Sequence, residues 1–407
     1  MVKKVEEMFP EFHQEKISNN DFKKEKNNLI VLDTNFLLQI LELPIDIASK
    51  YIDSLKEIKN NLYIPYLVAL EFHFNKSTKK KNKARNAQLY VSNIEKKIEE
   101  LEKSVSDIEL LKMENGNEEL NKLKGNLELF KKDFLNRVNS FVQNEITDKE
   151  DKLYNEVLNV ISYSVGEQYS QDWIDAVENE GKSRYLENIP PGYNDSEKIG
   201  VRKYNGITYR QKFGDLIIWK DILEKSKEQS NYEKVIFITN DGESTKKNDW
   251  IYKTSNMKVG PDIFLMNELK MLSNKKLYIL NNTTFVNMIN ELTIEEIDRI
   301  EFEEEKKYIV KIPEWRLEET IKEIADKNSK NQSDIIWFLD SENRLAKIDY
   351  DKLTIQNLVS ILSDRNESEM LKEELLKKIE NQPESPLSKE INNMMHNQDE
   401  NFLTKNN

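Results

Sequence analysis

The sequence contains no cysteine and only three histidines, His13, His73 and His396. The absence of cysteine excludes disulfide bonds, zinc–thiolate sites, iron–sulfur clusters and cysteine nucleophiles. Three histidines nearly exclude a site built from several imidazoles. Any catalytic chemistry must therefore depend on carboxylates, hydroxyl groups, lysines or a bound metal ion.

Long apolar runs are missing as well. None approaches the roughly 20 residues that span a bilayer, and the N-terminus lacks the apolar core of a secretory signal. We therefore expect a cytoplasmic protein without membrane contacts.

Positive charge is in short supply. The 407 residues include 74 acidic and 61 basic side chains, which gives a formal net charge of −13. A protein with this balance is not expected to hold nucleic acid through its overall charge, so any such contact requires a local basic patch.

Four short apolar runs predict buried strands. Stretches with helical periodicity separate them, and strands that alternate with helices are typical of an α/β fold with a parallel sheet. The expected strands cover residues 28–32, 62–64, 235–239 and 277–280.

A long insertion separates the second and third expected strands, and we place it at about residues 76–190. Apolar residues recur in steps of three and four at 94–111 and again at 120–141, with a polar break at 115–117. Two such heptad-like seams predict an antiparallel coiled-coil hairpin that projects from the sheet domain as an arm.

Composition divides the rest of the chain. We expect an N-terminal extension at residues 1–27, the α/β domain with its arm at 28–290 and a disordered polar tail at 382–407. Between them, residues 291–381 begin with an acidic stretch and predict a small helical module. Its expected helices lie near residues 315–325, 335–339 and 355–379.

Four carboxylates occupy informative positions. Asp33 follows the first strand, Glu71 lies on the helix after the second, Asp215 begins an apolar helix, and Asp241 follows the third strand. Because ligands collect at the carboxyl ends of parallel strands, we expect these side chains to face one crevice.

Each acid also has an ordinary structural interpretation. Asp33 and Asp215 could cap the helices that follow them, Asp241 could be a turn residue, and Glu71 could be a solvated helix residue. Four such coincidences at one sheet edge are harder to credit than a shared site. Converging carboxylates suit Mg²⁺ or Mn²⁺, which activate water for attack on a phosphoryl group.

At these residues the sequence resembles the PIN-domain ribonucleases, in particular a bacterial PIN-like branch with a long central helical insertion. The successive acidic motifs are Val31-Leu32-Asp33-Thr34-Asn35, Glu71, Gly214-Asp215 and Thr239-Asn240-Asp241. Accompanying segments are Ile64-Pro65-Tyr66, Pro190-Pro191-Gly192-Tyr193-Asn194-Asp195, Lys247-Asn248-Asp249-Trp250 and Gly260-Pro261. The resemblance covers roughly residues 28–285.

The resemblance implies a PIN-like, FEN-like parallel sheet and metal-dependent cleavage of RNA or, in relatives, DNA. It implies that Asp33, Glu71, Asp215 and Asp241 are catalytic ligands of Mg²⁺ or Mn²⁺. The residues implied to orient these ligands or a water, or to add charge near them, are Asn35, Thr239, Asp195 and Asp249. One departure is Asn240, where this branch more often has a second acid.

A basic run follows Glu71. Its six cations, Lys76, Lys79, Lys80, Lys81, Lys83 and Arg85, could contact phosphates beside the site or could form a solvated helix start. We expect His73 to be structural and Trp219 and Trp250 to belong to the core. Tyr193 could stack on a base or pack in the core.

The sequence thus predicts a metal-dependent endonuclease that acts on RNA, and a toxin or antiviral-defence role is compatible with this branch. The alternative is a catalytically inactive PIN-like protein that binds nucleic acid or engages a protein partner through the arm or the C-terminal module. All four acids are present, which favours the enzyme.

Overall fold

The structure is a computed structural model of the chain. The residues that it describes are 4–381 without 24–26, 107–111, 148, 229–232, 243–248, 255–256, 301–305, 331–334, 351–352 and 365–366. The expected tail therefore lies outside the described residues. The chain folds as two compact units, residues 1–282 and 283–407, and the domain limits expected from composition stay predictions.

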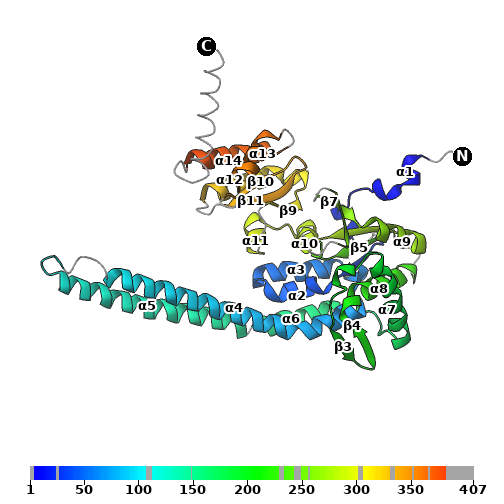
Figure 1. Ribbon diagram of the computed structural model, residues 1–407, viewed down its shortest axis with the longest axis horizontal. Helices are drawn as coiled ribbons and strands as arrows, with labels where there is room; N and C mark the ends of the chain where they lie inside the picture. Colours follow the sequence, from blue (N-terminus) through cyan, green and yellow to red (C-terminus); the bar gives the residue numbers. More distant parts are fainter. Residues whose placement is uncertain are drawn as a thin grey trace, which may run out of the picture. The chain divides into compact units, whose positions relative to one another are not determined.

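A four-stranded parallel sheet forms the centre of the first unit, and this confirms the predicted fold (Figure 1). Its strands are β1 (Leu29–Leu32), β2 (Leu62–Tyr63), β5 (Lys234–Ile238) and β8 (Lys276–Leu280), in the order β2–β1–β5–β8. Strand β1 lies inside the sheet and all four of its residues are buried. Strands that are buried on both faces require continuous apolar runs, which is why these were visible in the sequence.

Helices accompany the strands of this sheet. They are α1 (Val5–Met8), α2 (Thr34–Glu42), α3 (Ile45–Glu57), α6 (Lys149–Ile161), α7 (Gln171–Leu186), α8 (Gly214–Glu228) and α9 (Ile263–Ser273). Two antiparallel hairpins accompany them, β3 (Val201–Tyr204) with β4 (Ile207–Arg210) and β6 (Ile251–Thr254) with β7 (Met257–Pro261). No described helix combines the length and apolar character that a bilayer crossing requires.

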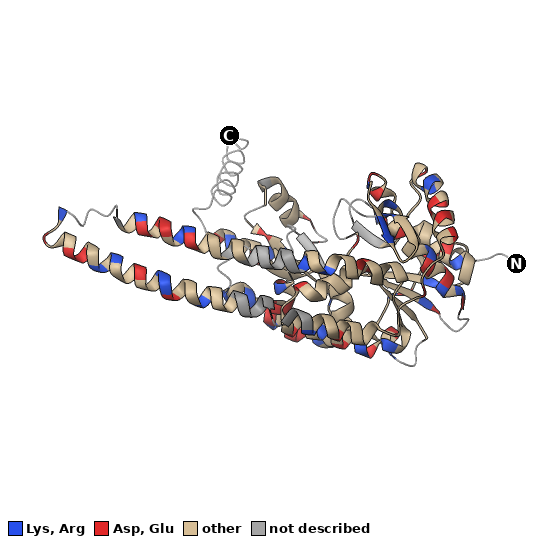
Figure 2. Cartoon of the chain, turned by 90° about the horizontal axis from the view of Figure 1, so that it is seen from below, with Lys and Arg blue, Asp and Glu red and all other residues tan. Residues whose placement is uncertain are grey.

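The arm consists of two long helices, α4 (Tyr66–Ser106) and α5 (Gly116–Thr147), which lie side by side in both views (Figures 1 and 2). The sequence suggested that the helix carrying Glu71 ends before the basic run, but it does not. It continues without interruption for 41 residues and is itself the first helix of the arm.

The second unit contains an antiparallel sheet as well as helices. Its three strands, in the order β10–β11–β9, are β9 (Lys306–Lys311), β10 (Ile335–Leu339) and β11 (Arg344–Asp349). The helices are α10 (Asn282–Asn290), α11 (Ile294–Arg299), α12 (Leu317–Lys330), α13 (Ile355–Ser363) and α14 (Glu369–Asn381). One apolar core joins the sheet to α13 and α14 through Phe338, Ile348, Leu358 and Leu375.

The prediction of a purely helical C-terminal module is therefore wrong in one respect. The expected helix near residues 335–339 is strand β10, which pairs with β11 from Ile335↔Asp349 to Leu339↔Leu345. A five-residue apolar run is too short for its periodicity to separate a helix from a strand, and the paired strand lies further along the chain. The expected helix at 355–379 is divided into α13 and α14.

Candidate active site

The Asp33 carboxylate is held by three hydrogen-bond donors at the carboxyl edge of the sheet. Strands β1 and β5 end together, with Leu32 opposite Ile238, so that Asp33 and Thr239 leave the sheet side by side. Thr34 N donates to Asp33 Oδ1 at 2.6 Å, and Thr239 Oγ1 donates to Asp33 Oδ2 at 2.7 Å. Asn35 Nδ2 also donates to Oδ2, at 2.6 Å. Asp33 caps helix α2, as one alternative held, but its second oxygen is bound from elsewhere.

Asn35 and Thr239 join the two loops that carry Asp33 and Asp241. Asn35 Nδ2 lies 2.9 Å from Thr239 Oγ1, and Asn35 Oδ1 accepts from the Asn240 backbone at 3.2 Å. The Asp241 backbone N–H in turn donates to Thr239 Oγ1 at 3.0 Å. These bonds fix the backbone of Asp241 relative to the Asp33 side chain, which is what groups that orient site carboxylates need to do.

Three further amide side chains, those of Gln39, Asn240 and Asn282, hydrogen-bond to one another beside these two loops. The buried Asn282 donates through Nδ2 to Gln39 Oε1 at 2.7 Å, and its backbone N–H donates to Asn240 Oδ1 at 3.0 Å. Asn240, the departure from the family pattern, thus has a structural use. An acid at this position could not donate to Gln39, as the Asn240 amide does at 3.4 Å.

The carboxylates raise one another's pKa values. Burial and the charge of Asp241 raise the pKa of Asp33 to about 7, although hydrogen bonds from Thr239 and Thr34 oppose the rise. Burial, followed by the charges of Asp241, Asp33, Asp249 and Asp195, raises the pKa of Asp215 well above its usual range. Asp33, Asp215 and Asp241 therefore lie within electrostatic range of one another.

This pKa shift predicts a pH-dependent stability in EDTA. Between pH 4 and about 7 the native protein keeps the Asp33 proton that the unfolded chain releases, so this group's contribution to stability falls as the pH rises through that window. The Asp33→Asn variant has no titrating group at position 33. We expect the stability of the wild type, measured relative to that variant by urea unfolding, to decline from pH 4 to pH 8. A constant difference would contradict the burial of this carboxylate among other acids.

A cation faces Glu71. Arg202 Nη1 lies 3.8 Å from Glu71 Oε1, and Thr34 Oγ1 donates weakly to Oε2 at 3.4 Å. Burial raises the pKa of Glu71, while the charges of Arg202 and Lys198 lower it. Helix α8 begins close by, because a Cβ on Gly214 would lie 3.8 Å from Glu71 Oε1.

The loop at 190–195 lies against the aspartates. Gly192 has a φ of +89°, and its N–H donates to the buried Asp249 Oδ2 at 2.6 Å. A Cβ on Gly192 would lie 3.1 Å from the Cβ of Asp215, so glycine permits this close approach. Asp195 is buried and forms an ion pair with Lys198. Asp249 is thus an anchor of this loop, and Asp195 has a cationic partner.

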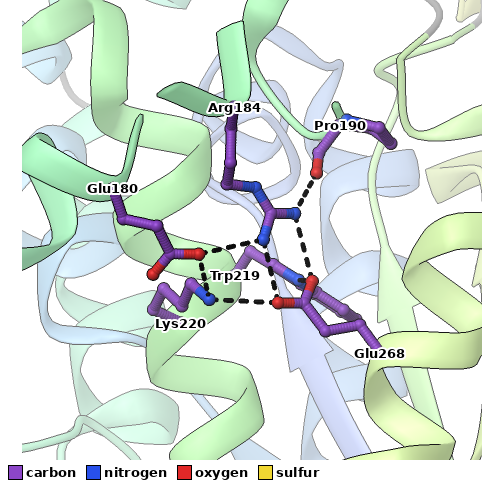
Figure 3. A network of polar contacts seen from close by, with 6 residues as sticks. All are labelled: Glu180, Arg184, Pro190, Trp219, Lys220 and Glu268. Carbon is purple, nitrogen blue, oxygen red and sulfur yellow. Dashed lines mark hydrogen bonds and ion pairs between the residues drawn. The ribbon is translucent and has the colours of Figure 1, made fainter. Parts of the chain in front are cut away.

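A buried ionic network fixes the start of that loop (Figure 3). Arg184 on α7 donates to the Pro190 carbonyl and contacts Glu268 on α9 at 2.8 Å. Glu268 also accepts from Trp219 Nε1 at 2.7 Å and from Lys220 Nζ at 3.0 Å, both on α8. Three helices and the loop therefore meet at one carboxylate. Burial would raise the pKa of Glu268, but hydrogen bonds from Arg184 and Trp219 hold it below its usual range.

The expected basic patch is only partly described. Lys76 Nζ lies 3.7 Å from the centre of the Tyr154 ring, and Lys79 Nζ lies 2.8 Å from Glu42 Oε1. Both cations already have partners within the protein. The side chains of Lys80, Lys81, Lys83 and Arg85 lie outside the described residues, although their backbone belongs to α4. Blue and red bands alternate along both helices of the arm in Figure 2.

The structure also describes the two predicted core tryptophans, His73 and Tyr193. Trp219 and Trp250 are buried and contact each other edge to face, which confirms that they belong to the core. His73 Nδ1 lies 2.7 Å from the Ala69 carbonyl, one turn earlier in α4, as a structural histidine would. Tyr193 is half-buried, so both of its interpretations stay open.

Sequence reasoning missed Arg202. It lies on the β3–β4 hairpin, 131 residues from Glu71, and nothing in its own neighbourhood points to that partner. The signal that could have found it is Asn205-Gly206, a typical two-residue hairpin turn between alternating residues.

The donor set of the site fits a divalent cation. Among the residues that the structure describes, no cation forms an ion pair with Asp33 or Asp215, and both partly buried carboxylates feel the charges of other acids. Mg²⁺ or Mn²⁺ would relieve that repulsion through oxygen ligands. In the described ranges, however, no three histidine, aspartate or glutamate side chains are grouped as a ready-made metal site.

Comparison with known proteins identifies the domain. A family model described as a PIN like domain matches residues 29–265, which is more than half of the chain. This agrees with the resemblance seen in the acidic motifs and with the parallel sheet. Comparison with curated proteins and with solved structures gave no match. Because the family model matches residues 29–265 and the parallel sheet agrees with it, the chain belongs to the PIN-like domain family.

Proposed function

We propose that the protein is a metal-dependent endonuclease that hydrolyses phosphodiester bonds, with RNA as its substrate. PIN-like domains are typically nucleases, and what supports the proposal here is that the charges of Asp33, Asp215 and Asp241 act on one another. Buried carboxylates that repel one another have no structural benefit by themselves, because they oppose folding. They become useful when a cation joins them.

Each residue has a role in this proposal. Asp33, Asp215 and Asp241 hold Mg²⁺ or Mn²⁺, with Glu71 beside them. A bound ion of this type stabilises charge on the phosphoryl group and activates a water. Asn35 and Thr239 keep the Asp33 carboxylate in one orientation through bonds of 2.6 and 2.7 Å.

The test is incubation of the purified chain with labelled RNA and DNA of the same sequence, in Mn²⁺, in Mg²⁺ and in EDTA. We expect internal cleavage only with a divalent cation, and faster cleavage of RNA. Cleavage that persists in EDTA, or no cleavage under any condition, would refute the proposal. Binding without cleavage would favour the inactive nucleic-acid-binding alternative.

Two further parts of this proposal concern partners. The basic run on α4 would contact the nucleic-acid backbone with the four cations whose side chains are not described, and the arm or the second unit would engage a protein partner. A toxin or antiviral-defence role would require such control of the nuclease, because uncontrolled cleavage of RNA is harmful to the cell.

Metal binding should be visible in the stability of the protein. We expect Mn²⁺ to raise the melting temperature of the wild type, because the ion binds the native carboxylate cluster much better than the unfolded chain. The gain is about 2.7 kcal/mol when the free ion exceeds its Kd a hundredfold. The Asp33→Asn variant should respond much less, since it has lost a charged ligand.

The measurement is a thermal melt of each protein with EDTA and with Mn²⁺. Asp53→Asn is the matched control, because Asp53 is an exposed carboxylate that pairs with Lys56 on α3. It should keep the full wild-type shift. Equal shifts in Asp33→Asn and the wild type would exclude Asp33 as a ligand.

A further inference from the structure

Two exposed aromatic rings, one of them three residues after Glu71 on α4, contact each other. Phe74 on α4 is 39% exposed, and Tyr204 at the end of β3 is 50% exposed. Their rings meet edge to face, with centroids 6.2 Å apart and an interplanar angle of 87°. The β3–β4 hairpin that carries Tyr204 projects from the sheet domain near the base of the arm (Figure 1). Large aromatic side chains that remain accessible in pairs are typical of a surface on which another flat group stacks.

Arg202 connects this aromatic pair to the acids. Its guanidinium lies 5.0 Å from the Phe74 ring centre, and its Nη1 lies 3.8 Å from Glu71 Oε1. Nη2 donates to Asn75 Oδ1 at 3.1 Å, whereas the buried Nη1 makes no hydrogen bond to any described residue. The guanidinium is ion-paired with Glu71 through Nη1, and its planar set of donors is of the kind that matches phosphate oxygens.

The surroundings carry positive charge that the overall composition conceals. Residues 197–212 contain five cations and one acid, in a protein with a net charge of −13. Three of these cations form ion pairs: Lys198 with Asp195, Arg202 with Glu71 and Arg210 with Glu178. Lys203 is exposed on the face of the hairpin opposite Arg202. A local positive field next to the acids is what a phosphate backbone requires.

We propose that Phe74, Arg202 and Tyr204 form a subsite for one unpaired nucleotide of a single-stranded nucleic acid, next to the phosphate that is cleaved. The base stacks on the exposed rings, and the guanidinium contacts an adjacent phosphate. Phe74 is less than one helical turn from Glu71, so one nucleotide step joins the two places. This inference rests on the proposed nuclease function and narrows its substrate to strands whose bases are free to stack, because a duplex keeps its bases paired.

The experiment measures binding of the full chain to labelled oligonucleotides by fluorescence anisotropy in EDTA, so that cleavage does not interfere. Tyr204→Ala and Phe74→Ala should each weaken binding of single strands by about 5- to 140-fold, and should leave duplex binding unchanged. Tyr204→Phe should retain the wild-type affinity, because a phenyl ring stacks as well. Arg202→Ala should lower the log–log salt slope by about 0.7.

Tyr163→Ala is the matched control. Tyr163 is 91% exposed, and Lys59 Nζ lies 5.9 Å from the centre of its ring. This variant should bind like the wild type. Wild-type affinity in Tyr204→Ala, or an equal loss for single strands and duplexes, would overturn the subsite.

The two proposals fail in distinguishable ways. Binding that depends on Tyr204, without cleavage in Mn²⁺, would reject the nuclease and keep the subsite. Metal-dependent cleavage with unchanged affinity in Phe74→Ala and Tyr204→Ala would keep the nuclease and reject the subsite.

Discussion

The Asp215→Asn variant should lose metal-dependent cleavage by about a thousandfold, which corresponds to ~4 kcal/mol of transition-state stabilisation. Four other carboxylates raise the pKa of Asp215, and so it lies where their charges meet. The amide keeps the shape of the side chain but removes a negative ligand. The fold should survive, and stability in EDTA should rise, because one of the repelling charges is gone.

The measurement is single-turnover cleavage of labelled RNA in Mn²⁺, together with urea unfolding in EDTA. Asp33→Asn should behave in the same way. Asp53→Asn, which changes a carboxylate that is 56% exposed, serves as the control and should cleave normally. Wild-type turnover by the purified Asp215→Asn protein would remove Asp215 from the candidate site.

The Arg184→Ala variant should be less stable than the wild type by about 3–5 kcal/mol. Arg184 is buried, with side-chain exposure of 7%, and its removal leaves the Glu268 carboxylate with Trp219 and Lys220 only. The Glu268 carboxylate then loses the guanidinium that binds both of its oxygens, and Lys220 compensates for only part of that loss. The Pro190 carbonyl also loses its donor, so the loop that contacts Asp215 should loosen.

Urea unfolding gives the loss of stability directly. Arg137→Ala is the control, because Arg137 is 79% exposed in its pair with Asp133 and such pairs contribute less than about 1 kcal/mol. Combining Arg184→Met with Glu268→Leu should restore part of the stability, since neither charge is then left alone. An Arg184→Ala protein as stable as Arg137→Ala would show that the Arg184–Glu268 ion pair contributes no more to stability than an exposed one.

Several residues of the candidate site could be predicted because their positions depend on the strands next to them in the sequence. An apolar strand such as Leu29–Leu32 is recognisable from its own residues, and the acid that follows it must emerge at the carboxyl edge of a parallel sheet. The same reasoning placed Asp241 behind β5. The use of Asn35 and Thr239 came from the family resemblance, and the bonds between them agree with it.

Other parts depended on distant partners and were not predictable in the same way. Strand β10 is a strand because β11 pairs with it, and the run Ile335–Leu339 alone does not contain that information. Arg202 meets Glu71 only after the hairpin folds back on α4. Asn240 has an evident reason to be an amide only once Asn282 and Gln39 lie beside it.

Helix α4 gives the candidate site a mechanical property. Glu71 lies near one end of an unbroken helix, and its far end, at Ser106, is about 50 Å away along the helix axis. One continuous helix therefore connects the acidic edge of the sheet with the far end of the arm. A tilt of about 5° of this helix about Glu71 would sweep its far end through about 5 Å.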